Sequence, residues 1–154
     1  MKTVTIAIIG TCTGNPGPGR WACVLRYGDD ASELAGGSQC TTKRRMELRA
    51  VTEGLQALRE PCEVNLISDN QYLIDGIGYW RGEWRLTMFT RLWKHLPDPL
   101  PDGDLWLKLD TLANKHLIRG QHVDAIFSHP DKQRCDELAD LTSGSMWACT
   151  AGPA

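Results

Sequence analysis

The chain has 154 residues, of which 42% are hydrophobic and 23% charged, and its formal net charge is −2. This length and composition are typical of one soluble globular domain, and no apolar run reaches the ~18 residues of a membrane span. The slightly acidic balance argues against strong, general binding of nucleic acid, which needs a basic face for phosphate contacts, but it is compatible with a local basic patch.

The amino terminus and the cysteines indicate a cytoplasmic location. Met1-Lys2 leads directly into strand-like sequence, so we expect no signal peptide. The six cysteines are dispersed without a C-x-x-C pair, which argues against a zinc site. We expect them to be reduced thiols that are mostly buried.

The beginning of the chain predicts an antiparallel meander of three strands. Residues 2–9 alternate well enough for a strand, with three apolar side chains on one face: Val4, Ile6 and Ile8. A dense Pro-Gly turn at 15–19 follows. Residues 21–27 and 31–39 then predict a hairpin around Gly28.

The rest of the chain predicts helices that alternate with strands. Apolar residues at helical spacing predict a helix over 44–59, which ends before Pro61. A short buried strand at 64–68 and a short helix at 70–76 follow. The last elements are a helix capped by Asp104, a strand over 118–126 and a helix over 131–141.

This order predicts an α/β fold, in which a mixed five-stranded sheet (three antiparallel strands, then parallel strands) is flanked by helices. We expect one domain over 1–142 and a C-terminal tail over 143–154 that frays.

Acidic residues stand at strand ends and helix starts, where open α/β sheets gather their sites. Glu47 lies early in the long helix, Asp69 ends a buried strand, and Asp136 lies in the last helix. Carboxylates that meet from different elements are usual ligands of Mg²⁺. Each of them can equally be a solvated surface charge, and spacing alone does not bring the three together.

Collinear motifs over roughly residues 2–141 resemble the type I ribonuclease H family, in the family's order and spacing. They are Gly14-Asn15-Pro16-Gly17-Pro18-Gly19, Met46-Glu47-Leu48, Asp69-Asn70-Gln71-Tyr72, Asp104-Leu105-Trp106, and His129-Pro130 with Arg134-Cys135-Asp136-Glu137-Leu138-Ala139. The resemblance implies a ribonuclease H-like fold. It also implies hydrolysis of the RNA strand in RNA–DNA hybrids by two metal ions, Mg²⁺ or Mn²⁺.

The resemblance assigns metal ligation to Glu47, Asp69 and Asp136. The family's central Asp, which bridges both metals, falls on Ile9, and the loop His that assists product departure falls on Ile126. Isoleucine cannot coordinate a cation, and two Mg²⁺ ions ~4 Å apart repel strongly without a shared anion. We therefore expect the two-metal state to be lost, and Ile9 to relieve carboxylate repulsion and add apolar burial.

Two nearby residues offer an alternative to the lost ligands. Asp124 and His129 lie in or beside the mobile loop of the family and could move inward. A flexible loop residue is a poor substitute for a carboxylate fixed on a central strand.

Part of the family's hybrid-binding surface is retained. Positions that contact RNA 2′-hydroxyls hold Gly10, Cys12, Asn15 and Gln71. The segment that grips a DNA phosphate is Thr42-Lys43-Arg44 here, so that two amides have become cations. Together with Arg45, this basic cluster either holds a phosphate by charge or is a solvated helix end.

The family's substrate handle is strongly basic with interleaved tryptophans. Here Trp80 and Trp84 remain, but the charges between 80 and 104 cancel and apolar residues are added. This change indicates a protein-contact surface over 80–101, such as a homodimer interface.

Two hypotheses follow. The first is a degenerate ribonuclease H-like protein that has lost hybrid cleavage and needs no metal, and that acts by binding an RNA–DNA hybrid, another nucleic acid or a protein partner. The second is an active endoribonuclease that uses Glu47, Asp69 and Asp136 with Mg²⁺ or Mn²⁺. The isoleucines at 9 and 126 favour the first.

Overall fold

A computed structural model describes residues 2–14, 17–80, 102–123 and 130–141. The expectations for Asn15, Trp84, Ile126, the segment 81–101 and the tail 143–154 fall outside these ranges. The side chains of Trp80 and Asp136 are likewise outside the description.

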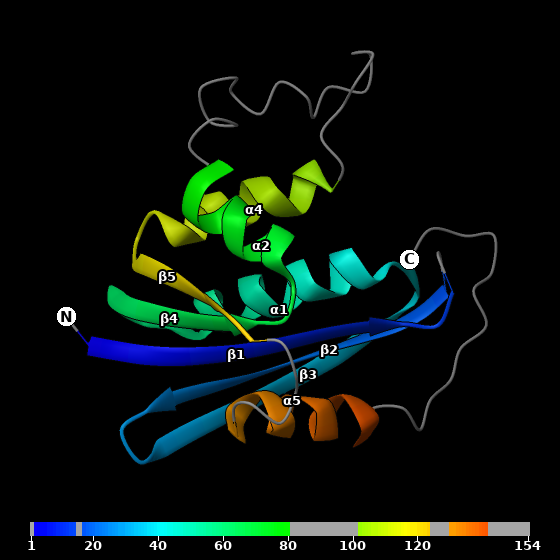
Figure 1. The fold of residues 1–154 in the computed structure, drawn as a ribbon, viewed down its shortest axis with the longest axis horizontal. Coiled ribbons are helices and arrows are strands. Elements are labelled where there is room, and N and C mark those ends of the chain that lie inside the picture. Colours follow the sequence, from blue (N-terminus) through cyan, green and yellow to red (C-terminus); the bar gives the residue numbers. More distant parts are fainter. Residues whose placement is uncertain (1, 15–16, 81–101, 124–129, 142–154) are drawn as a thin grey trace.

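One five-stranded sheet forms the centre of the fold, with the strand order β3-β2-β1-β4-β5 (Figure 1). The first three strands pair antiparallel, whereas β4 pairs parallel with both β1 and β5. The mixed sheet predicted from the sequence is thus confirmed. The strands are β1 Lys2–Cys12, β2 Gly17–Tyr27, β3 Asp30–Thr41, β4 Cys62–Ser68 and β5 Leu117–His122.

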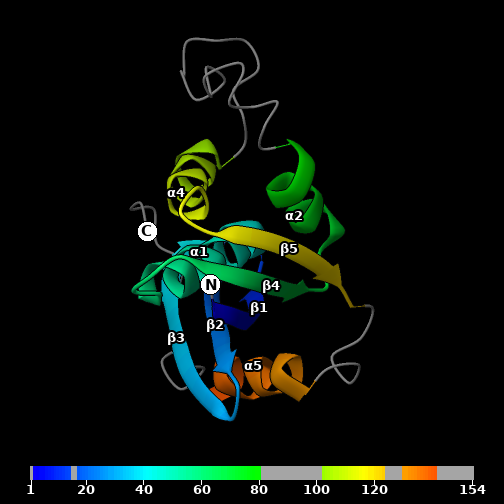
Figure 2. The ribbon, with the colours of Figure 1, turned by 90° about the vertical axis from the view of Figure 1, so that its left-hand side faces the viewer.

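Helices cover both faces of the sheet. Helices α1, α2 and α4 lie on one face, and α5 lies on the other (Figures 1 and 2). Within the described ranges, no helix is both long and apolar enough to cross a membrane. The helices are α1 Lys43–Ala57, α2 Gln71–Asp75, the π-helical turn η1 Gly76–Trp80, α4 Gly103–Ala113 and α5 Pro130–Leu141.

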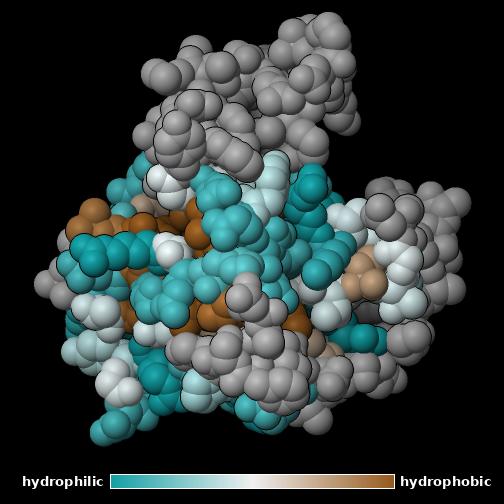
Figure 3. Space-filling model, in the orientation of Figure 1, coloured by the Kyte–Doolittle hydropathy of each residue, from teal (hydrophilic) through white to brown (hydrophobic). Residues whose placement is uncertain are grey.

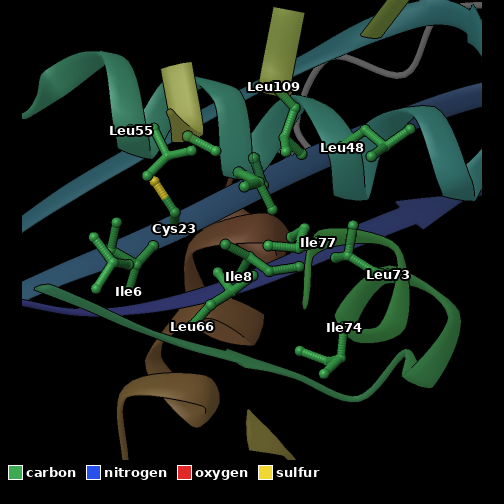
Figure 4. Close-up of a cluster of buried hydrophobic side chains, with 14 of the residues drawn as sticks. Ile6, Ile8, Cys23, Leu48, Leu55, Leu66, Leu73, Ile74, Ile77 and Leu109 are labelled. Atoms are coloured by element: carbon green, nitrogen blue, oxygen red, sulfur yellow. The ribbon is translucent and has the colours of Figure 1, made fainter. Parts of the chain in front are cut away.

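Successive side chains of β1 point to opposite faces of the sheet, and the core has one part on each face. Val4, Ile6 and Ile8 face α1 and pack in the larger cluster with side chains of β4, α2 and α4 (Figure 4). The opposite face of the sheet packs against α5 through a smaller cluster. This second cluster contains Ala7, Ala22, Val24, Ile67, Val123, Cys135 and Ala139.

Two local expectations are wrong. The residue that precedes α4 as its N-cap is Asp102, with a left-handed φ of 56°, and not Asp104. The carboxylate of Asp104 instead accepts hydrogen bonds from Arg45, which is a partner far away in the sequence. Cys40 is disulfide-bonded rather than a reduced thiol, whereas Cys12, Cys23, Cys62 and Cys135 are thiols as expected.

Candidate nucleic-acid interface

An open cleft of ≈ 810 Å³ lies where the ends of β4 and β5 meet the starts of α1 and α2. The carboxyl ends of parallel strands share one edge of a sheet, which is where α/β folds form sites. The surface around α2 in Figure 3 is mostly hydrophilic. The described residues that line the cleft are Gly14, Thr42, Lys43, Arg44, Glu47, Asp69, Asn70, Gln71, Tyr72, Asp102 and His122.

Ile9 is not among the described residues that line this cleft. It pairs with Ala22 of β2 and, half-buried, packs against the apolar cluster beneath α5. Cys135 of α5 donates its Sγ–H to the Ala7 carbonyl at 3.1 Å, which holds this helix close to β1. The expected apolar burial of Ile9 is confirmed, and the position supplies packing instead of a metal ligand.

Gly10, the next residue, lets α1 approach β1. A Cβ at this position would lie 2.6 Å from Cγ of Glu47 and 2.8 Å from the Met46 carbonyl carbon. The close approach leaves Glu47 only 3% exposed although it lines the cleft. Its Oε1 accepts a hydrogen bond from Nδ2 of Asn70 at 3.3 Å. Glu47 is therefore a carboxylate held in a fixed position.

Asn70 links this carboxylate to the end of β4. Its Oδ1 caps α2 by accepting a hydrogen bond from the backbone N–H of Tyr72 at 3.0 Å. The backbone N–H of Asn70 donates to Oγ of Ser68 at 3.1 Å. The neighbouring Asp69 is exposed to the cleft. The structure thus brings Glu47 and Asp69 into one cleft, as the family resemblance implied.

His122 is a cleft residue that the sequence reasoning missed. It ends β5 in register with Ser68 of β4, and its Nε2 lies 3.1 Å from the carbonyl oxygen of Asp69. The parallel pairing of these strands puts the two strand ends side by side. The sequence analysis expected this strand to continue to residue 126, so it did not place His122 at a strand end.

Among the described residues, the donor set is incomplete for a two-metal centre. Glu47 and Asp69 are present, but the family's central position is the hydrocarbon side chain of Ile9, packed on the α5 side. Among the described residues, no three His, Cys, Asp or Glu side chains gather closely enough to hold a metal ion. Asp136 lies on α5, and its side chain is outside the description.

Of the three basic residues expected at this wall, only two are among the described residues that line the cleft. Lys43 and Arg44 are exposed at its wall, and the Arg44 guanidinium lies 4.6 Å from the centre of the Tyr72 ring. This distance is within the range of a cation–π contact. The Tyr72 ring in turn meets buried Trp106 edge-on, with a centroid distance of 6.1 Å. Arg44 is therefore supported by a ring that the core itself positions.

Arg45 does not belong to this cationic surface, so the expected cluster of three is wrong. Its guanidinium donates to Asp102 at 3.2 Å and to Asp104 at 2.9 Å. These hydrogen bonds raise the pKa of Arg45 and lower the pKa of Asp104. The charge of Arg45 is used to join α1 to α4.

The remaining predicted contact residues have structural partners. Thr42 caps α1 by accepting from the Arg45 amide at 3.2 Å, and Gln71 donates to Asp75 at 2.8 Å, while both line the cleft. Cys12 donates its Sγ–H to the Thr41 carbonyl at 3.2 Å. This bond directs the thiol towards β3.

Comparisons with known proteins agree with this architecture. The family model RNase H matches residues 1–143. A protein named Ribonuclease H from Rhizobium meliloti (strain 1021) is 45% identical over 140 residues, which cover 90% of this chain and 89% of the relative. Ribonuclease H from Alcanivorax borkumensis (strain ATCC 700651 / DSM 11573 / NCIMB 13689 / SK2) is 43% identical over 141 residues, 91% of each chain.

Solved structures show the same fold. LC9-RNase H1, described as a type 1 RNase H with the type 2 active-site motif, matches with a TM-score of 0.78 at 22% identity, covering 96% of this chain and 74% of its own. LC11-RNase H1 in complex with RNA/DNA hybrid matches with a TM-score of 0.60 at 14% identity, covering 90% and 98%. With the family model and the sequence relatives, these matches show that the chain belongs to the ribonuclease H family.

Proposed function

We propose that this chain binds RNA–DNA hybrids in the cleft and cleaves them far more slowly than a ribonuclease H with a complete set of carboxylates, or not at all. The observation that carries the proposal is the position of Ile9. Its side chain packs against the apolar cluster beneath α5. The family resemblance places the carboxylate shared by both metals at this position.

The loss is expected to be large because it removes a fixed charge from the reacting centre. Deleting one preorganised electrostatic element commonly costs about 10²–10³ in rate. A carboxylate that two cations share costs more, since the mutual repulsion of the cations is then uncompensated.

Binding is supported by what the cleft retains. Lys43 and Arg44 offer cations to phosphates, and the exposed Gln71 offers the carbonyl oxygen of its side chain to RNA 2′-hydroxyls. A protein of the same fold, LC11-RNase H1, has been solved with an RNA/DNA hybrid bound. The chain thus keeps the means to hold a hybrid where it lacks the means to position two metals.

An active ribonuclease H is the second candidate, and the names of the relatives at 43% and 45% identity favour it. Glu47 and Asp69 share the cleft as that activity requires. In this alternative, residual chemistry depends on the remaining carboxylates and on Mg²⁺ or Mn²⁺. A protein partner at 80–101 and a cytoplasmic location stay predictions.

An end-labelled RNA–DNA hybrid incubated with Mg²⁺ or Mn²⁺ separates the candidates, with Asp69→Asn as the control. Turnover that Asp69→Asn abolishes would establish the active enzyme and refute the proposal. We expect no turnover, together with hybrid binding, and the return of cleavage in the double variant Ile9→Asp, Ile126→His.

A further inference from the structure

We infer that Cys149 closes the disulfide of Cys40 and thereby fastens the C-terminal tail to the end of β3. The bond makes the chain more stable when it is formed than when it is reduced, so that stability depends on the thiol redox state. Cys40 is not among the described residues that line the cleft, and the bond is therefore independent of the proposed function.

The state of the described cysteines identifies the partner. Cys40 is disulfide-bonded. The chain has six cysteines, and the four others within the described ranges are thiols: Cys12, Cys23, Cys62 and Cys135. A disulfide needs a second sulfur, and these four do not supply it. Cys149 is the one cysteine of the chain that remains.

Three of the thiols are poorly placed to exchange with this disulfide. Cys23 and Cys135 have no exposed surface, and Cys62 is only 2% exposed. Burial raises the pKa of the Cys23 thiol to about 12, which leaves almost none of the reactive thiolate at neutral pH. Cys135 donates its Sγ–H to a backbone carbonyl. These thiols are thus shielded from reagents that reach the surface.

Cys40 itself is accessible. It lies next to the last residue of β3, which is an edge strand of the described sheet and pairs there with β2. It is half-buried and lines a surface pocket of ≈ 300 Å³ together with residues of α1 and α4. Both another segment of the chain and a small thiol reagent can therefore approach this position.

The length of the closed loop makes the bond important for stability. A bond between Cys40 and Cys149 encloses about 110 residues, which include β4, β5 and every helix of the described fold. A disulfide restricts the unfolded chain, and the restriction grows with the length of the loop. For a chain of this size, we expect the bond to raise the melting temperature by about 5–15 °C.

Thiol–disulfide exchange makes the bond reversible. A thiolate of a dithiol reductant attacks the Cys40 sulfur, the bond to Cys149 breaks, and the Cys149 thiolate takes up a proton. The second thiolate of the reductant then attacks the reductant's own sulfur in the mixed disulfide and releases Cys40 as a thiol. The reductant leaves as a cyclic disulfide, having given two electrons to the chain. Oxidised glutathione reverses the transfer and is itself reduced to two thiols.

Disulfide mapping tests the partner directly. The full chain, purified without reductant, is alkylated under denaturing conditions and cut with trypsin and a glutamate-specific protease, because cleavage after Glu137 separates Cys135 from Cys149. We expect mass spectrometry to find the Cys40 and Cys149 peptides joined, and the other four cysteines alkylated. A peptide that joins Cys40 to Cys12, or to the Cys40 of a second copy, overturns the inference.

Thermal unfolding tests the effect of the bond. We expect the unchanged chain to melt about 5–15 °C lower in dithiothreitol than in oxidised glutathione. Cys40→Ser and Cys149→Ser are each expected to melt at the lower temperature in both buffers, and the double variant to melt no lower than either single variant. Cys12→Ser is the matched control, because Cys12 is a half-buried thiol, and we expect it to keep the full response to dithiothreitol.

Each further outcome decides the question. Equal melting temperatures of the unchanged chain in the two buffers overturn the inference, and this comparison needs no variant to fold. A Cys149→Ser variant that keeps the response to dithiothreitol also overturns it. Neither measurement involves a hybrid or a metal ion, so a failure here leaves the proposed function intact.

Discussion

The substitution Ile9→Asp tests how the packing of this residue affects both the stability of the fold and metal binding. Ile9 is half-buried in the cluster beneath α5. Truncating a buried isoleucine costs about 2–5 kcal/mol, so a half-buried one costs about 1–2 kcal/mol. A carboxylate placed at the edge of the same cluster adds a desolvation cost of about 1–2 kcal/mol. We therefore expect Ile9→Asp to destabilise the metal-free fold by about 2–4 kcal/mol.

Thermal unfolding followed by circular dichroism measures this change. For a chain of this size, each kcal/mol shifts Tm by about 2–4 °C, so Ile9→Asp in EDTA is expected to melt about 5–15 °C lower than the unchanged chain. If the new carboxylate completes a metal site, Mg²⁺ at ten times its Kd returns about 1.4 kcal/mol. The unchanged chain is expected to show no such gain.

Two variants separate the contributions. Ile9→Asn has the shape of the aspartate without its charge, so its melting temperature reports the packing loss. We expect that melting temperature to be the same with and without Mg²⁺. Ile9→Val removes one methylene and is expected to cost less than about 1.5 kcal/mol. An Ile9→Asp variant that is as stable in EDTA as the unchanged chain would show that Ile9 does not stabilise the α5 interface, and the packing argument would be wrong.

Other substitutions test the architecture around the cleft. Gly10→Ala is expected to cost about 1–3 kcal/mol in urea unfolding, because its Cβ would meet Glu47 and Met46, whereas Gly78→Ala, with open space around it, should cost less. His116 accepts the Cys62 amide through Nδ1, and burial and then Lys115 lower the pKa of this imidazole from 6.5. The unfolded chain therefore binds this proton more readily than the folded chain. The stability from His116 is fully present above about pH 6.5 and is lost as the pH falls through the lowered value; His116→Gln should flatten that part of the urea-unfolding profile. His122→Ala removes the hydrogen bond to the Asp69 carbonyl, which is expected to lower Tm by about 2–4 °C.

Local patterns predicted most of the fold. The alternation of Val4, Ile6 and Ile8 identified the face of β1 that packs on α1, and the spacing of Leu48 and Leu55 identified the buried face of α1. These features depend on the spacing of apolar residues within one strand or helix, which can be read from the sequence alone. The elements and their order therefore agree with expectation, and the differences lie mainly at their ends.

Contacts between distant residues could not be predicted in the same way. Arg45 looked like part of a basic cluster because Lys43 and Arg44 are its neighbours, but its partners are 57 and 59 residues away. The disulfide of Cys40 also depends on the fold, and the argument from cellular compartment gave the wrong state. Charge and redox state at a site are set by the tertiary neighbours.

A substitution at position 9 is expected to change the stability of the fold and metal binding together. Ile9 lies at the end of the apolar stretch of β1, beyond the last pair of β1 with β4, and its side chain packs against the cluster beneath α5. A carboxylate there is costly beside the cluster, whereas isoleucine extends the cluster and offers no oxygen donor. Stability and metal binding are thus expected to oppose each other at this residue. A variant that gains Mg²⁺ binding with no loss of stability in EDTA would contradict this coupling.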